Sequence, residues 1–148
     1  MILELLILIF ILWLATTPPR LPKKSYLEYN NKIQEKLDFI YANLQNLLLQ
    51  DNLNIKFTLN PSDKQTYTEN KSHIYLVLTK PNGEFYDDNT LIYAAIHELS
   101  HIICPSSNNE DPHTSIFETI QNHYLNLAKE YKLYNPNKPI DPDYPCQN

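Results

Sequence analysis

The 148-residue sequence contains a single glycine, Gly83. Phosphate-cradling loops, dinucleotide-binding turns and the nucleophile elbow of serine hydrolases need several closely spaced glycines, so these classes of site are excluded. The only cysteines, Cys104 and Cys146, are too few for a disulfide framework and form no Cys-x-x-Cys pair. Basic residues are also scarce. The sequence has 12 lysines and arginines and 17 acidic residues, so its formal net charge is −5. Nucleic-acid binding is therefore not indicated.

The N-terminal segment is strongly hydrophobic, reading MILELLILIFILWLA over residues 1–15. A helix through Thr17 would extend about 25 Å at ~1.5 Å per residue, slightly less than the ~30 Å hydrocarbon core of a bilayer. Local thinning of the bilayer can close this difference. The segment lacks the basic start and the small-x-small cleavage site of a signal peptide. We therefore expect a transmembrane anchor over residues 1–19, rather than a cleaved signal peptide or a buried helix of a soluble protein.

Positive charges follow the hydrophobic segment at Arg20, Lys23 and Lys24. The positive-inside rule then predicts a single-pass membrane protein whose globular part lies in the cytosol, joined to the anchor by a linker over residues 20–24. The glycosylation sequon at residues 70–72 tests this orientation, because it would be modified only if the globular part lay on the opposite side.

Hydrophobic periodicity predicts one α+β domain over residues 25–134. The expected elements are a helix from residue 25 to about 48, strands over 54–59, 65–68 and 74–79, a helix from 87–89 to 104, and a helix from Asp111 to about Tyr134. The strands would form a small mixed sheet. The segment over residues 135–148 is too rich in proline for a helix, so we expect an extended tail laid over the domain.

Residues 97–101 read HELSH, an HExxH pattern inside the first of the two C-terminal helices. Side chains four residues apart lie on one helix face with Cβ atoms ~5–6 Å apart, so His97 and His101 can bind one metal ion. Glu98 would lie beside the metal and deprotonate a zinc-bound water, whose pKa zinc lowers from ~15.7 towards ~7. Two unrelated surface histidines would give the same letters, but the place of the motif in a capped helix after a strand favours the zinc site.

A catalytic zinc ion requires a third protein ligand and an open coordination position. His113 is the first candidate, since it lies near the start of the next helix, where the helix dipole disfavours a protonated imidazole. Glu118, one turn further along, would instead make a glutamate-type site. Asp111 is expected to be occupied as the N-cap of that helix. The choice between His113 and Glu118 stays open on spacing alone.

The run IYAAIHELSHIICPSSNNEDPHTSIF, residues 92–117, resembles the WLM and SprT-like metallopeptidases. These families share an HELxH helix, a loop, and a third histidine followed three or four residues later by Phe or Trp. His113 and Phe117 match that last pair. The resemblance extends over about residues 74–134 and is greatest to the short, membrane-anchored members predicted in large DNA viruses.

The resemblance implies a small zincin-like domain in which His97, His101 and His113 bind zinc and Glu98 is the catalytic base. It also implies that the strand over residues 74–78 lies at the edge of the sheet along the cleft, where an extended peptide or protein substrate would pair with it. The tails that link other members to the repair of DNA–protein crosslinks are absent, so that role is not expected.

The expected function is therefore that of a membrane-anchored, zinc-dependent metallopeptidase. The alternative is a membrane-anchored binding or scaffolding module in which the zinc site is structural or inactive. The two differ in the fourth coordination position, which is open in a catalytic site and closed in a structural one. A fourth protein ligand, such as Glu118 or Cys104, would favour the alternative.

Overall fold

The computed structural model describes residues 23–105 and 113–146, with side chains from residue 28 onward. The backbone divides into two compact units, residues 1–32 and 33–148; the first described helix begins in the first unit and continues into the second, which contains all of the other elements. The predicted anchor over residues 1–19 lies outside the described residues. Among the helices that are described, none combines the length and the apolar character needed to cross a bilayer.

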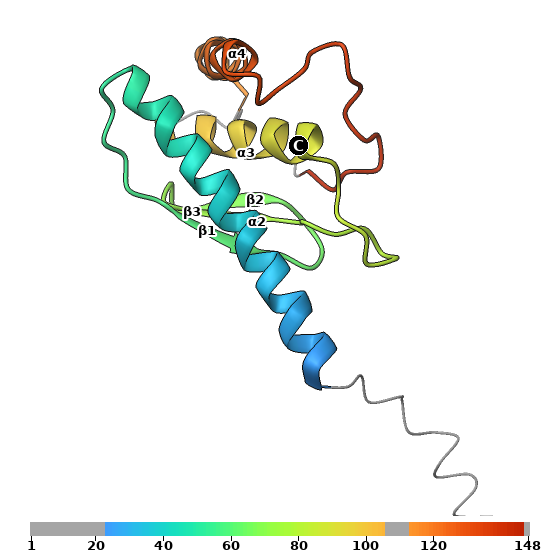
Figure 1. The fold of residues 1–148 in the computed structure, drawn as a ribbon. Helices are drawn as coiled ribbons and strands as arrows, with labels where there is room; N and C mark the ends of the chain where they lie inside the picture. The colour runs from blue at the N-terminus through green and yellow to red at the C-terminus, as the bar shows by residue number, and fades with distance from the viewer. Residues whose placement is uncertain (1–22, 106–112, 147–148) are drawn as a thin grey trace, which may run out of the picture. The chain divides into compact units, whose positions relative to one another are not determined.

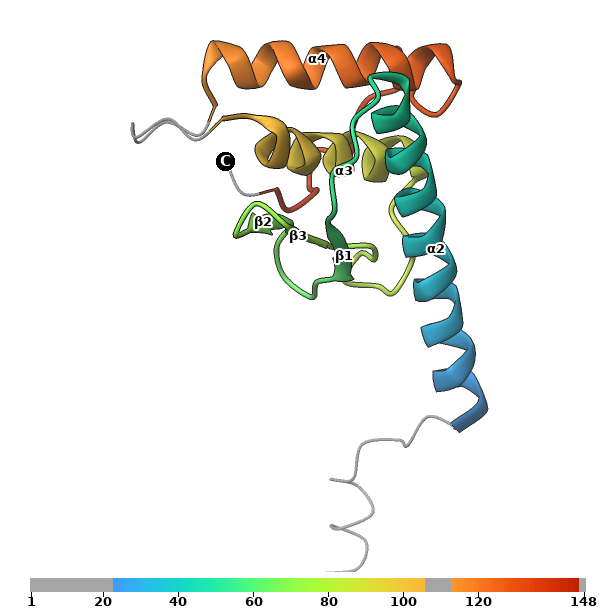
Figure 2. The same ribbon diagram turned by 90° about the vertical axis from the view of Figure 1, so that its left-hand side faces the viewer.

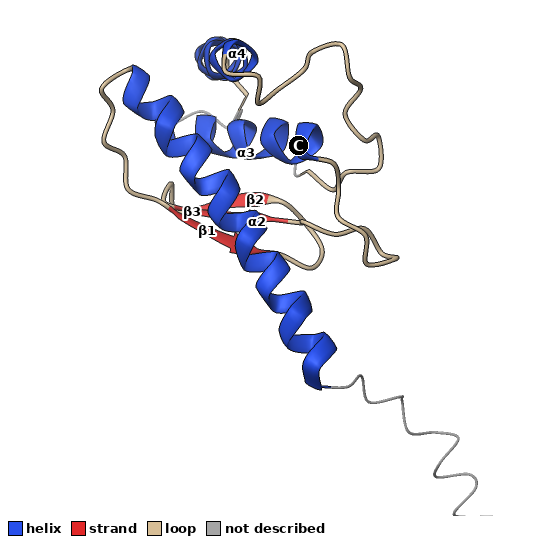
Figure 3. Ribbon diagram, in the orientation of Figure 1, coloured by secondary structure: helices blue, strands red, loops and turns tan. Residues whose placement is uncertain are grey.

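The chain folds into helices and a small mixed sheet, which confirms the predicted α+β class (Figure 3). In chain order the elements are α2 (Lys23–Gln50), β1 (Thr58–Pro61), β2 (Tyr67–Glu69), β3 (His73–Leu76), α3 (Asp88–Ile103) and α4 (Ser115–Glu130). Each strand is shorter than its predicted range, and β1 is shifted towards the C-terminus. Strand ends depend on partners elsewhere in the chain, which alternation of side chains does not reveal.

The strand order in the sheet is β1-β3-β2. β1 runs parallel to β3, with Thr58 opposite His73, and β2 runs antiparallel to it, with Tyr67 opposite Tyr75. The expectation that residues 74–78 form an edge strand is therefore wrong, because β3 has a neighbour on each side. The two edges of the sheet belong to β1 and β2. Burial alternates along β3, with Ile74 and Leu76 buried and His73 and Tyr75 half-buried, so one face of the strand packs on the core.

Helix α3 lies between the sheet and α4, an arrangement visible in both views (Figures 1 and 2). Because it is covered on two sides, most of its residues are buried, including the charged Glu98. The part of α2 within the second unit contributes a row of fully buried side chains at three- and four-residue spacing to the same core, namely Leu37, Ile40, Leu44, Leu47 and Leu48. This packing holds α3, the helix that carries the HExxH motif, in a rigid environment.

Local capping sets the start of both C-terminal helices. Asp87 caps α3, as expected, and its side chain accepts a hydrogen bond from the backbone of Thr90. Helix α4 begins at Ser115 and not at Asp111, so the predicted start is wrong. Thr114 has extended backbone angles and its hydroxyl accepts from the backbone N–H of Phe117, which makes Thr114 the N-cap.

The tail after α4 contains no helix over residues 135–146 and is held against the domain by buried polar contacts. The buried side chain of Asn89 on α3 donates to the carbonyl groups of Asn135 and Lys138 and accepts from the backbone N–H of Asn135. Further along, the hydroxyl of Tyr144 is hydrogen-bonded to that of Thr66 at 2.7 Å. The tail therefore passes from the start of α3 to the segment just before β2.

Candidate metal centre

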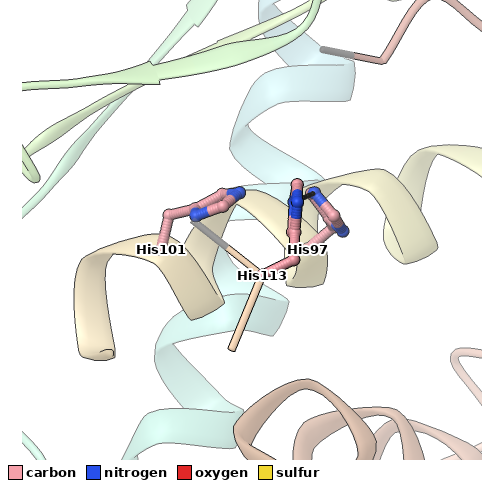
Figure 4. A group of neighbouring side chains, drawn as sticks. All are labelled: His97, His101 and His113. Atoms are coloured by element: carbon pink, nitrogen blue, oxygen red, sulfur yellow. Dashed lines mark hydrogen bonds between the residues drawn. The ribbon is translucent and has the colours of Figure 1, made fainter. Parts of the chain in front are cut away.

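Three histidines converge between α3 and the start of α4 (Figure 4). His97 and His101 lie one turn apart on α3, with ring centroids 5.0 Å apart. His113 immediately precedes the N-cap of α4, and its ring lies 5.1 Å from each of the other two. The Nε2 atoms of His97 and His113 are 3.3 Å apart. Packing of α4 on α3 thus brings His113 next to His97 and His101, which both lie on α3.

The donor set fits a single metal ion. One nitrogen from each of the three histidines lies within 4.8 Å of the others. Two nitrogens that each lie ~2.05 Å from a tetrahedral zinc would be ~3.3 Å apart, and this is the separation between His97 and His113. The described residues thus form a possible metal-binding group, and its three-imidazole composition suits zinc among other transition metals.

Burial keeps the imidazoles of His97 and His101 uncharged at neutral pH, as metal binding requires. Desolvation is the main reason that the pKa of His97 falls to about 4, and the charge of His113 lowers it further. A hydrogen bond with Gln121 acts in the opposite direction and raises this pKa. Desolvation is also the main reason that the pKa of His101 falls to about 4, with smaller contributions from the two other histidines and Lys71. Neither ring has to lose a proton before it binds a cation.

Phe117 forms the apolar side of this centre. Its ring centroid lies 4.4 Å from that of His101, 4.9 Å from that of His113 and 5.1 Å from that of His97. The side chain is almost fully buried, on the first turn of α4. It therefore excludes water from one face of all three imidazoles and restricts their orientation.

Glu98 lies beside the histidines, on the part of α3 that faces β2. Its side chain is buried, and Oε2 accepts a 2.6 Å hydrogen bond from the hydroxyl of Thr68. Burial raises the pKa of Glu98 to about 7, although the bond from Thr68 acts in the opposite direction. A carboxyl group with a pKa near the working pH can both accept and release a proton.

The structure adds one residue that the sequence analysis did not select, Cys146. Its Sγ belongs to a second group of potential ligand atoms, together with His97 and Glu98, in which all three atoms lie within 4.8 Å of one another. The thiol points at Glu98, with 4.0 Å between Sγ and Oε1. Burial, and then the charge of Glu98, raises the pKa of this thiol to about 11. Its residue type was the only available signal, because the sequence around Cys146 contains no ligand-spacing motif.

The remaining candidates lie apart from the centre. Glu118, the alternative third ligand, is exposed on α4 and belongs to neither group of ligand atoms found among the described residues. Cys104 lies buried at the C-cap of α3, where its thiol points to the carbonyl of Pro105, and it also belongs to neither group. Asp111 lies outside the described residues. The structure thus brings together His97, His101 and His113, as the sequence analysis favoured.

No family model matches the chain, and no solved structure matches it. The chain is similar to viral proteins described as uncharacterized. Protein 042R of Invertebrate iridescent virus 3 is 35% identical over 83 residues, which are 55% of this chain and 50% of that protein. Protein 136R of Invertebrate iridescent virus 6 is 27% identical over 143 residues, 89% of this chain and 78% of that protein. Protein R325 of Acanthamoeba polyphaga mimivirus is 26% identical over 69 residues, 47% of this chain and 33% of its own.

Proposed function

We propose that this chain is a zinc-dependent metallopeptidase with a zincin-like domain, related to the WLM and SprT-like enzymes. The convergence of three imidazoles beside the buried carboxyl group of Glu98 is the observation that supports it. His97, His101 and His113 are the metal ligands, and Glu98 is the general base. A bound zinc supplies a Lewis acid, which polarises the scissile carbonyl group and activates water for attack.

Glu98 moves the proton in this mechanism. Its carboxylate takes a proton from the attacking water and passes it to the nitrogen of the departing amine. Thr68 holds the carboxylate in place, because its hydroxyl contacts both Oε2 and the backbone carbonyl of Glu98. The bond fixes one oxygen of Glu98 and leaves Oε1 on the side that faces the tail.

The substrate pairs with β2 in this proposal. An extended peptide needs a free strand edge, and β3 offers none because it is the central strand. Of the two edge strands, β2 lies next to the catalytic carboxyl group through the contact between Thr68 and Glu98. A peptide bound along the outer edge of β2 would therefore pass in front of the metal centre.

The Glu98→Gln variant tests the proposal, with Glu118→Gln as a matched control at an exposed position. Zinc content is measured by mass spectrometry on the full chain in mild detergent, and hydrolysis is followed with a fluorescently labelled casein. Glu98→Gln should keep its zinc and lose activity, whereas Glu118→Gln should keep both. Activity retained by Glu98→Gln would refute the assigned base.

A second candidate function is a binding or scaffolding module with a structural metal. The position of Cys146 favours it, because the thiol lies near the ligand His97 and, if it joined the three histidines, would make a closed, four-ligand site. A zinc-loaded wild type that is inactive, and stays inactive when Cys146 is replaced by serine, would support this function over the peptidase.

In either case we propose that residues 1–19 anchor the chain in a membrane and that the domain faces the cytosol. Glycosylation of the sequon at residues 70–72 in cells would contradict that orientation.

A further inference from the structure

The last described residues of the tail lie along the edge of the sheet to which the proposed function assigns the substrate. The backbone N–H of Thr66, the residue before β2, donates to the carbonyl of Pro145 at 2.8 Å. Thr66 and Cys146 form an isolated parallel β-bridge. Figure 2 draws this part of the tail beside β2 and α3. The chain thus places a segment of its own beside Thr66, the residue that leads into β2.

The bridge at Thr66 delivers Cys146 to the metal centre. Its Sγ lies within 4.8 Å of a ligand atom of His97 and of one of Glu98, and it is not part of the group formed by His97, His101 and His113. Sulfur is a preferred zinc ligand, with a Zn–S distance of ~2.3 Å. The thiol therefore lies beside the ligand His97, and a shift of the tail would bring it within bonding distance of a metal held by the three histidines.

We infer that Cys146 is a fourth ligand of the metal held by His97, His101 and His113, and that the tail thereby closes the centre against substrate. This inference rests on the proposed function for its regulatory meaning, and the ligand assignment starts from the approach of the thiol to His97 and Glu98. As sulfur coordinates, the thiol releases its proton to solvent and the S–metal bond takes the fourth position. A peptide can then reach the centre only after that bond breaks and the bridge at Thr66 opens.

The attachment of the tail suits reversible closure. Tyr144 anchors it, since its hydroxyl bonds to Thr66 and its ring packs edge-on against Tyr86 with centroids 4.8 Å apart. Cys146, two residues further on, is only half-buried and has the backbone bridge and the metal centre as its contacts. The thiol can therefore leave while Tyr144 stays in place. Because the anchor keeps it close, the thiol competes with a peptide as an intramolecular ligand.

Cobalt provides a direct test, since a thiolate bound to Co²⁺ gives a charge-transfer absorption in the near ultraviolet that imidazole ligands do not give. The full chain is purified in mild detergent with its cysteines reduced, stripped of metal and titrated with Co²⁺. The variants are Cys146→Ser and, as the matched control, Cys104→Ser. We expect the band in wild type and Cys104→Ser and its absence in Cys146→Ser, which should still bind cobalt through its histidines.

Alkylation gives a second measurement that does not depend on activity. Iodoacetamide should modify Cys146 more slowly in the zinc-loaded chain than after removal of zinc with a chelator, with the site identified by peptide mass spectrometry. Stoichiometric cobalt without the thiolate band, or equal alkylation of Cys146 with and without zinc, would overturn the assignment. A band that persists in Cys146→Ser would also overturn it.

Peptidase activity separates this inference from the proposed function. If the tail covers the centre in ~90% or more of the molecules, Cys146→Ser should be at least about tenfold more active than wild type. If wild type is active but lacks the cobalt band, and Cys146→Ser is no more active than wild type, the tail inference fails and the peptidase proposal stands. A cobalt band in wild type with no activity in either protein means that Cys146 is a ligand and the peptidase proposal fails.

Discussion

Zinc should stabilise the folded domain, and replacement of His113 by alanine should remove most of that effect. His113 is the only histidine of the centre outside α3, so a metal bound by all three links α3 to the start of α4. Without it, two imidazoles on one helix remain from the three-histidine group. Glu118 is exposed on the first turn of α4 and belongs to neither ligand group, so Glu118→Ala is the matched control.

The size of the effect follows from binding linkage. At a free zinc concentration about 100 times Kd, binding adds ~2.7 kcal/mol to the free energy of unfolding. At ~3–5 °C per kcal/mol for a domain of this size, the unfolding midpoint should rise by ~10 °C. Loss of a residue that hydrogen-bonds to a metal ligand weakens metal binding ~10–100-fold, so loss of a ligand itself should raise Kd by more than ~100-fold. At the same zinc concentration the variant would then gain ~0.4 kcal/mol at most, or ~1–2 °C.

The assay is thermal unfolding of the full chain in detergent, followed by circular dichroism with and without zinc. Wild type and Glu118→Ala should show the large shift, and His113→Ala should show the small one. An equal shift in wild type and His113→Ala would refute the assignment of the third ligand. A wild type that zinc does not stabilise at all would refute the metal centre itself.

Two further predictions concern the surroundings of the centre. Phe117→Ala removes the ring that packs on all three imidazoles and should destabilise the metal-free domain by ~3–5 kcal/mol, measured by urea unfolding; a loss below ~1 kcal/mol would contradict this packing. The hydroxyl of Tyr124 bonds to Asp51 and is the main cause of the lowered pKa of that carboxyl group. Because a lowered pKa stabilises the fold above the unfolded value of ~3.9 and the effect is lost as pH falls through the folded value, Tyr124→Phe should cost ~1 kcal/mol at pH 7. The cost should shrink as the pH is lowered through ~3.9 and beyond, and urea midpoints that differ equally at pH 7 and in that acidic range would contradict this origin.

The sequence by itself determined the features that depend on neighbours along the chain. The HExxH pair needs only helical spacing, since residues four apart meet on one face of any α-helix, and α3 forms where its cap and apolar periodicity predict. The pair of His113 and Phe117 was recognisable only through the resemblance to WLM and SprT-like metallopeptidases, in which an aromatic residue follows the third histidine. Helix α4 shows the limit of this reasoning, because Asp111 and Thr114 are both acceptable N-caps and the backbone uses Thr114.

Tertiary structure decided the features that depend on distant partners. Alternation predicts a strand but not its neighbours, so the sheet order that makes β3 central and gives an edge to β2 could not be read from the sequence. Thr68 bonds to Glu98, and Cys146 approaches His97. Each contact joins segments that are far apart in the sequence, so no local sequence pattern predicts it. The ligand types were present in the sequence, but the three histidines meet only when α4 packs on α3, and Cys146 approaches His97 only when the tail packs beside Thr66.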